Sequence, residues 1–270
     1  MTKDSIFKCY ELQKKEQMEI EKKSPYYIDG EWKSIVEGRL PSLQKILNYD
    51  HQAFYTILHV AGPNEVARHP HIAERISKYI KEESVICEIG SGIGGVCYNI
   101  LSKYNPKGKI KYIIFDIPEI LFIASCFLEL NLTKDLRVFH YDGNKSKFNF
   151  KNILEDHDLI LLPHYLIEHM PKNILNCFIN TGSFCEMPER TCKNYFYKIL
   201  ERSKDSSIFY FEFRKEENLM HYPPFSPLKS EIYVDPILRE CSQNLGYDLK
   251  NILMETSGCQ ANYWEAVYEN

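Results

Sequence analysis

The stretch Ser84-Val-Ile-Cys-Glu-Ile-Gly-Ser-Gly-Ile-Gly-Gly95 places an apolar run directly before four glycines in six positions. The run Val85 to Ile89 fits a β-strand that is buried on both faces. The glycines permit a positive φ and a close approach of the backbone to a ligand. A helix after them would present its unpaired N–H groups to the same ligand. The stretch therefore predicts a strand, a glycine loop and a helix that form the floor of a nucleotide site.

The spacing of these glycines leaves the kind of nucleotide open. A Gly-x-Gly-x-x-Gly pattern also marks dinucleotide sites. Here the order is Gly90-Ser-Gly92-Ile-Gly94-Gly95, so the third glycine is one residue early or absent. The remainder of the chain must therefore decide between a dinucleotide and another nucleotide.

Composition narrows the class of protein. The chain has 270 residues, 44% of them hydrophobic and 26% charged, which suits one sizeable core with a helical appendage. A net charge of -4 gives no basic surface for binding nucleic acid, so we expect the protein to act on a small molecule. No apolar run reaches the length of a membrane span, and the N-terminus lacks the apolar segment of a signal peptide. We therefore expect a cytoplasmic protein.

The cysteines predict no metal site and no disulfide framework. Nine are present, and none forms a Cys-x-x-Cys pair. Most lie in apolar contexts, where a reduced cysteine acts as a small buried hydrophobe.

From residue 81 onward, strand-like and helix-like segments alternate, which predicts an α/β fold with a parallel sheet and helices on both faces. Two short candidates, 136–141 and 158–162, compete to be the third strand of the sheet. The last two predicted strands are joined by Ser257-Gly258, so they should form an antiparallel hairpin, which argues against a dehydrogenase. The other expected strands are 84–89, 110–115, 174–180, 207–213, 247–254 and 262–268, and the expected helices begin near 96, 118, 188 and 235.

The first 80 residues differ in pattern and are expected to form a helical cap on a domain spanning 81–270. Lys3 to Lys23 alternates charges, which is typical of a solvated helical face. Residues 32–46 and 51–60 have helical apolar spacing. His69-Pro-His71 is interpreted as a linker.

Three stretches carry a resemblance to a known family. They are Glu88-Ile-Gly-Ser-Gly-Ile-Gly-Gly95, Tyr112-Ile-Ile-Phe-Asp-Ile-Pro-Glu119 and Ile179-Asn-Thr-Gly-Ser-Phe-Cys-Glu-Met-Pro188. With them the chain resembles, over about residues 80–270, the sugar O-methyltransferases found with surface-polysaccharide genes. The resemblance implies a Rossmann-like class I methyltransferase sheet with an antiparallel C-terminal hairpin. It also implies the cofactor S-adenosyl-L-methionine.

The resemblance also implies which residues hold the cofactor. Asp116 would take the ribose hydroxyls, and an acceptor-only carboxylate at the end of a strand suits two hydroxyl donors. The alternative for Asp116 is a carboxylate at the N-terminus of the next helix. Adenine contacts would come from Asp142 or from Pro163, depending on which short strand is the third. The remaining cofactor residues are Glu88, beneath the methionine moiety, and Gly90, Ser91, Gly92, Gly94 and Ile117.

Residues 180–188 follow the strand that would face the transferred methyl group. Methyl transfer from a sulfonium is an in-line displacement, so it needs an aligned acceptor and, for a hydroxyl, a base. Glu186 is a candidate base or sugar ligand; the alternative is a carboxylate that caps a helix. Asn180 and Ser183 are candidates to orient the acceptor, with a turn role as the alternative for Asn180.

Histidines supply a second candidate base and part of a candidate lid. His164 follows a predicted strand, and its alternative is a structural histidine. His164 and His169 are five residues apart, so they do not share a helical face and no joint metal site is expected. His221 and Tyr222 lie in Met220-His-Tyr-Pro-Pro-Phe225, which is either a lid over the acceptor or a surface loop.

The expected fold predicts an S-adenosylmethionine-dependent methyltransferase. The resemblance alone implies that it is an O-methyltransferase acting on a sugar or sugar-linked precursor of a capsular polysaccharide. One alternative acceptor is another small polar group, such as a phosphoramidate or amine of a capsule precursor. A third hypothesis is a non-catalytic methyltransferase-like partner subunit. The intact glycine loop and Asp116 disfavour it, because a subunit without activity needs neither.

Overall fold

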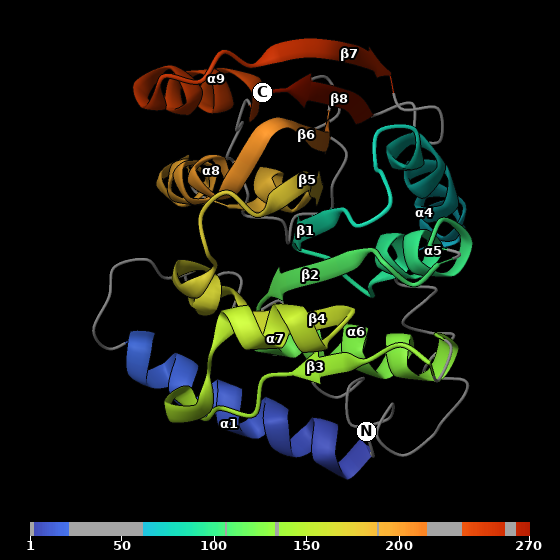
Figure 1. The fold of residues 1–270 in the computed structure, drawn as a ribbon, viewed down its shortest axis with the longest axis vertical. Helices are drawn as coiled ribbons and strands as arrows, with labels where there is room; N and C mark the ends of the chain where they lie inside the picture. Colours follow the sequence, from blue (N-terminus) through green and yellow to red (C-terminus); the bar gives the residue numbers. More distant parts are fainter. Residues whose placement is uncertain are drawn as a thin grey trace, which may run out of the picture.

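The computed structural model describes residues 3–21, 62–105, 107–132, 135–187, 189–214, 234–256 and 263–270. Their centre is one eight-stranded sheet in the order β3-β4-β2-β1-β5-β6-β8-β7, which Figure 1 shows stacked from one end of the molecule to the other. The strands are β1 (Val85–Ile89), β2 (Lys111–Asp116), β3 (Val138–His140), β4 (Leu159–Pro163), β5 (Leu175–Thr181), β6 (Ser203–Arg214), β7 (Lys250–Thr256) and β8 (Tyr263–Glu269).

Pairing within the sheet confirms the predicted fold class. The strands β3, β4, β2, β1, β5 and β6, neighbours in this order, pair in parallel. Strand β8 pairs antiparallel with both β6 and β7. The central strands are buried along nearly their whole length, because helices cover both faces. This burial explains why the strands read as continuous apolar runs in the sequence.

Two helical layers enclose the sheet (Figure 1). Buried Ile72, Val96 and Leu121 belong to the core on one face, while Ile153, Phe196 and Leu238 belong to the core on the other. The first layer consists of α4 (Gly62–Ser77), α5 (Gly95–Lys103) and α6 (Pro118–Asn131), and the second of α7 (Phe150–Asp156), α8 (Glu189–Arg202) and α9 (Val234–Leu245).

The two competing short strands both enter the sheet, but at different places. β4 pairs directly with β2, and its Pro163 lies opposite Asp116. β3 pairs with the outer side of β4 and forms the edge of the sheet. The strand beside β2 is therefore the later of the two candidates, 158–162.

Helix α1 (Lys3–Glu21) is only partly the solvated helix that the sequence predicts. Its Ile6, Cys9, Gln13 and Gln17 are buried, and they recur at helical spacing. Ile6 packs with Phe122 and its neighbours on the outer side of α6. Charge alternation hid this face, because Gln13 and Gln17 do not look apolar in the sequence.

The interpretation of His69-Pro-His71 as a linker is wrong. All three residues lie within α4, with Pro70 inside the helix. A proline there removes one backbone donor and strains the preceding turn. Burial of Ile72 and Ile76, together with ion pairs to the sheet, offsets that cost. The predicted helical segments 32–46 and 51–60 lie outside the described residues.

Seven cysteines have described side chains, and all of these are free and buried, as the sequence predicts; they are Cys9, Cys87, Cys97, Cys126, Cys177, Cys192 and Cys241. Within the same described ranges, no cluster of three or more His, Cys, Asp or Glu side chains is arranged to hold a metal ion. No helix in the described part of the chain is long and apolar enough to cross a bilayer.

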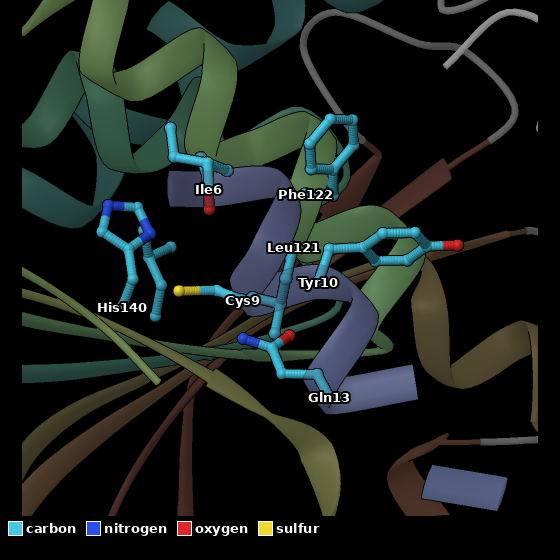
Figure 2. Close-up of a pocket in the computed structure, with 9 residues that line it drawn as sticks. Ile6, Cys9, Tyr10, Gln13, Leu121, Phe122 and His140 are labelled. Carbon is cyan, nitrogen blue, oxygen red and sulfur yellow. The ribbon is translucent and has the colours of Figure 1, made fainter. Parts of the chain in front are cut away.

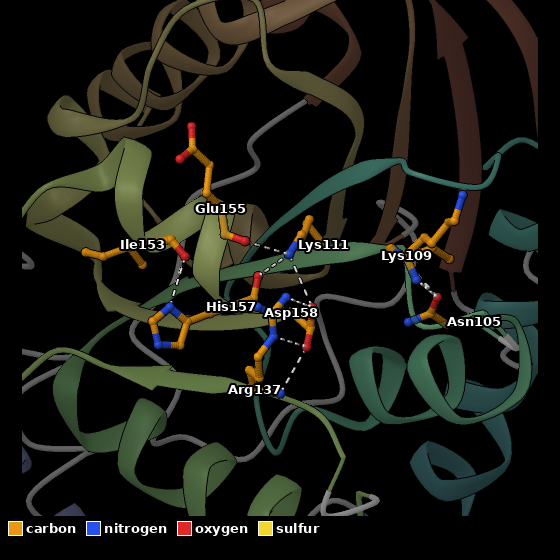
Figure 3. Close-up of polar contacts among 9 residues, drawn as sticks. Asn105, Lys109, Lys111, Arg137, Ile153, Glu155, His157 and Asp158 are labelled. Carbon is orange, nitrogen blue, oxygen red and sulfur yellow. Dashed lines mark hydrogen bonds and ion pairs between the residues drawn. The ribbon is translucent and has the colours of Figure 1, made fainter.

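A polar cluster at the N-terminal ends of β2 and β4 ties α7 to the sheet (Figure 3). Lys111 Nζ donates to the carbonyl of His157 at 2.8 Å and to Asp158 Oδ1 at 3.2 Å. Arg137 Nη2 donates to the same Asp158 oxygen at 3.0 Å. These residues lie at the edge of the sheet opposite the glycine loop, so their contacts stabilise the fold and do not build the candidate site.

Candidate functional site

The glycine loop turns β1 into α5 through three left-handed residues. Gly90, Gly92 and Gly94 have φ of 74°, 56° and 80°. A Cβ on Gly90 would collide with Ser183, and one on Gly94 would lie 2.9 Å from Leu128 Cδ1. A Cβ on Gly92 would meet no atom of the described chain within 4 Å. Gly92 is therefore the place in the loop where the backbone faces open space that a ligand can enter.

Asp116, at the end of β2, lies against this loop. Its Oδ2 accepts a hydrogen bond from Ser91 N at 2.8 Å, and its Oδ1 accepts one from Ile117 N at 2.8 Å. Burial raises the pKa of this carboxyl to about 7, although hydrogen bonds from Ile117, Ser91 and Gly92 oppose the rise. The carboxylate thus contacts both the glycine loop and the start of α6. Oδ2 also lies 3.5 Å from Ser91 Oγ, whereas Ile117 N is the one donor to Oδ1 among the described hydrogen bonds, so Oδ1 can accept from a further donor.

Glu88 lies beneath the loop and is fully buried. Tyr112 Oη donates to its Oε2 at 2.8 Å. Its Oε1 has no hydrogen-bond partner among the described residues. Burial raises the pKa of Glu88 to about 7, while the Tyr112 hydrogen bond acts in the opposite direction. The site thus contains a buried acceptor oxygen that a ligand or a water can satisfy.

The segment after β5 is tied to the end of β1. Asn180 Nδ2 donates to the Ile89 carbonyl at 2.8 Å, and Ser183 Oγ donates to the same carbonyl at 3.1 Å. Asn180 Oδ1 accepts from Phe184 N at 3.2 Å. Both candidate acceptor ligands therefore lie beside the glycine loop. Their described hydrogen bonds are to the chain itself, which favours a structural role for Asn180.

Three of the sequence-derived candidates fall outside what is described. Glu186 ends the short 3₁₀ helix η3 (Ser183–Glu186), but its side chain lies outside the described residues. His221 and Tyr222 lie wholly within residues 215–233, which are also outside them. Their predicted roles stay predictions.

His164 begins the 3₁₀ helix η2 (His164–His169) directly after β4. Burial lowers the pKa of its imidazole to about 4, although a hydrogen bond with the backbone of Asp116 opposes this. The ring is therefore neutral near pH 7 and is a weak base. This environment favours the structural alternative for His164, next to the end of β2.

The two alternatives for adenine are placed differently. Pro163 pairs with Asp116 across β4 and β2. Asp142 is exposed after the edge strand β3, and its Oδ1 accepts a hydrogen bond from Asn144 N at 2.9 Å within its own loop. Pro163 therefore lies on the strand next to that of Asp116, whereas Asp142 follows a strand one place further out in the sheet.

Sequence reasoning missed a set of charged side chains between α4 and the sheet, of which Arg68, Glu212 and Glu265 are buried. Glu212, Glu265 and Glu255 lie opposite one another on β6, β8 and β7. Arg68 Nε lies 2.8 Å from Glu212 Oε2, and Arg75 Nε lies 3.0 Å from Glu265 Oε2. The sequence signal for this set is the helical spacing of Arg68, His71 and Arg75 within α4, and Pro70 obscures it.

Arg68 also reaches the segment that follows β5. Its Nη2 donates to the Thr181 carbonyl at 3.2 Å, directly before Gly182, whose φ is 91°. The buried pair of Arg68 and Glu212 therefore fixes α4 to the ends of β5 and β6, next to the candidate acceptor region.

The sequence matches no protein-family model and no curated protein. Solved structures resemble it in fold. A SAM-dependent methyltransferase from Aquifex aeolicus is similar with a TM-score of 0.51 at 15% identity, over 80% of this chain and 97% of that protein. A candidate O-methyltransferase from Nostoc punctiforme is similar with a TM-score of 0.52 at 10% identity, over 82% of this chain and 61% of that one. A candidate exported protein from Bordetella parapertussis has a TM-score of 0.50 at 10% identity, over 76% and 67% of the two chains.

These likenesses concern the fold. The chain has the Rossmann-like sheet of class I methyltransferases, with the antiparallel arrangement β6-β8-β7 at its C-terminal end. The residues around the glycine loop offer three features that a ligand can use. No described atom lies within 4 Å of a Cβ placed on Gly92, Asp116 Oδ1 can accept a further hydrogen bond, and Glu88 Oε1 is a buried oxygen without a partner among the described residues.

Proposed function

We propose that the chain is an S-adenosylmethionine-dependent O-methyltransferase. The observation that carries the proposal is the meeting of Asp116 with the glycine loop beside the open face of Gly92. A carboxylate, backbone amides and free space for close approach together match the ribose and methionine parts of the cofactor. The fold supplies independent support, since a SAM-dependent methyltransferase from Aquifex aeolicus is similar to this chain in fold.

We further propose that the acceptor is a hydroxyl of a sugar or of a sugar-linked precursor of a surface polysaccharide. The support is the resemblance carried by Tyr112–Glu119 and Ile179–Pro188. The net charge of -4 is compatible with a small acceptor and unfavourable for nucleic acid. A phosphoramidate or amine acceptor is the alternative within the same chemistry, and a non-catalytic partner subunit is the alternative outside it. A cytoplasmic location belongs to the same proposal.

The cofactor supplies an electrophilic methyl group on a sulfonium. The residues of the chain bind the cofactor, align the acceptor with its methyl group and accept the proton of the acceptor hydroxyl. Asp116 would accept the ribose hydroxyls, Glu88 would accept a donor at the methionine end, and Gly92 would allow contact with the backbone. Glu186 is our first candidate to take the proton of the acceptor hydroxyl. His164 is the second, and burial lowers its pKa to about 4, which makes it a weak base near pH 7.

Calorimetry on the full chain tests the cofactor part of the proposal. S-adenosylmethionine and S-adenosylhomocysteine should bind, and NAD should not. Binding of NAD alone would overturn the proposal in favour of a dinucleotide enzyme. Turnover is then measured with sugars, sugar nucleotides and amines as acceptors, following the demethylated product. Cofactor binding with no turnover on any acceptor would favour the partner-subunit alternative.

A further inference from the structure

We propose that helix α1 forms the outer wall of the nucleoside end of the cofactor site, so that docking of α1 and binding of the cofactor are coupled. The inference rests on the proposed function, because it assumes that the nucleoside lies at the ends of β2 and β4. It assigns a role to a helix whose sequence shows charge alternation and no motif. Three separate contacts carry it, each to a segment that follows a different strand.

The first contact joins α1 to the start of α6. Lys14 Nζ forms an ion pair with Glu119 Oε1. The Glu119 side chain is only 7% exposed, while Lys14 keeps 30%. Glu119 lies three residues after Asp116, in the first turn of α6. Lys14 therefore neutralises a buried carboxylate directly beside the proposed ribose ligand.

The second contact joins α1 to the loop after β3. Gln13 Nε2 donates to the Tyr141 carbonyl at 2.7 Å, in a buried position. Gly143 in the same loop has a φ of 76°, and a Cβ there would lie 2.8 Å from Leu12 Cβ. The loop thus approaches α1 at a distance that only glycine allows.

The third contact joins α1 to the segment after β4. Tyr165 Oη donates to Glu16 Oε2 at 2.8 Å, and Lys145 Nζ lies 2.8 Å from Glu16 Oε1. Tyr165 comes two residues after Pro163, which pairs with Asp116. Glu16 therefore links the ends of β3 and β4 through one carboxylate.

These contacts lie at the carboxyl ends of three neighbouring strands of the parallel sheet, the edge at which ligands bind in open α/β folds. The first half of α1 is anchored separately, by the apolar contact of Ile6 with α6. A small pocket lies between α1 and α6 and is lined by Cys9, Gln13, His140 and neighbouring residues (Figure 2). The second half of α1 thus makes the polar contacts to the ligand-binding edge.

The polar contacts of the second half of α1 explain why docking of α1 and binding of the ligand are coupled. The loops after β2, β3 and β4 share α1 as a common partner, so α1 restricts all three at once. A ligand that needs these loops in one arrangement will bind more tightly when α1 is docked. By linkage, the bound ligand must stabilise docked α1 by the same factor.

The test measures binding of S-adenosylhomocysteine and of 5′-methylthioadenosine, which keeps the nucleoside but lacks the amino-acid end. Lys14→Met and Tyr165→Phe should weaken both ligands by a similar factor, about two- to tenfold. Lys15→Met is the matched control, because Lys15 is exposed on the next position of α1, and it should leave both affinities unchanged. Hydrogen exchange should also show that S-adenosylhomocysteine increases the protection of amides 9–17.

A purely structural role for α1 would give a different pattern. Unchanged affinities in both variants, or no added protection of α1 in the presence of ligand, would overturn the coupling while the proposed function stood. A loss confined to S-adenosylhomocysteine would place the effect at the amino-acid end and would also overturn it. Failure of the wild-type chain to bind either ligand would overturn the proposed function, and this inference with it.

Discussion

The carboxylate of Asp116 accepts a hydrogen bond from the backbone N–H of Ser91 at 2.8 Å, which joins the end of β2 to the glycine loop after β1. Two motifs that lie far apart in the sequence therefore form one surface. Asp116 acts both on the loop and, through Ile117 N, on the start of α6. Its two predicted roles, ligand acceptor and carboxylate at a helix start, are compatible in a single side chain.

Asp116→Asn should weaken cofactor binding by roughly tenfold or more, because losing charge-assisted hydrogen bonds costs about 1.5 to 3 kcal/mol. An amide at this position also directs N–H donors toward the N–H of Ser91 or Ile117, which are themselves donors. Calorimetry with S-adenosylhomocysteine measures the effect. Asp135→Asn, an exposed change of the same chemistry, is the control. An unchanged dissociation constant in Asp116→Asn would remove Asp116 from the site.

Gly92→Ala should abolish or strongly weaken cofactor binding while the chain still folds. The φ of 56° costs an L-residue about 1 to 2 kcal/mol, but the new Cβ meets no described atom of the chain within 4 Å. Gly108→Ala is a matched control, with a φ of 63°, similarly open space and a position in a loop away from the site. The temperature of thermal unfolding should fall by a similar amount in both variants, and the affinity for the cofactor should fall in Gly92→Ala alone. Equal binding by the two variants would contradict the proposed floor of the site.

Arg68→Met should destabilise the fold by about 3 to 5 kcal/mol, because it removes a buried guanidinium that lies 2.8 Å from the buried carboxylate of Glu212. The double variant Arg68→Met with Glu212→Gln should recover part of the loss, as denaturant unfolding would show. Lys107→Met removes an exposed ion pair with Glu82 and should cost no more than about 1 kcal/mol. If Arg68→Met costs no more than Lys107→Met, the buried pair does not hold α4 to the sheet.

The free energy of unfolding should fall as pH rises toward 7, in part because of Glu88. Its pKa is raised to about 7 in the folded protein, so the folded state holds a proton that the unfolded state has already released. The stabilising effect of that proton is present below the unfolded pKa and is lost as pH rises through the folded pKa, by up to about 1.4 kcal/mol per pH unit. Glu88→Gln should flatten this slope in denaturant titrations between pH 5 and 7.5. A slope that is identical in the variant would assign the linkage to other groups.

Glu186→Gln or His164→Asn should lower turnover by about 10² to 10⁴ if the residue is the general base. Affinity for S-adenosylhomocysteine should stay within a small factor of wild type, which separates a lost base from a lost fold. Burial of the His164 ring favours a structural role for it, so we expect the larger loss of turnover in Glu186→Gln. A pH-rate profile that loses its acidic limb in that variant would support a base over a positioning group. Full turnover in both variants would leave only their structural roles.

Local sequence signals predicted most of the fold correctly. The glycine loop, the apolar strands 84–89 and 110–115, and the closing hairpin all lie where the pattern placed them. The helix at Pro118 begins as expected, because a proline in the first turn removes a donor that has no partner there. Errors came where residues were interpreted by local pattern alone. Pro70 suggested a break, yet packing of Ile72 and Ile76 keeps α4 continuous.

What the sequence determined by itself is the presence of a strand, glycine loop and helix and the candidate residues on them, since backbone freedom and the period of apolar residues are properties of neighbouring positions. What only the tertiary structure decided is which distant residues meet. It placed β4 and not β3 beside β2, seated α1 on the loops after three strands, and matched Arg68 with Glu212. Strand order and buried charge pairing depend on contacts between residues far apart in the chain, and no single segment carries that information.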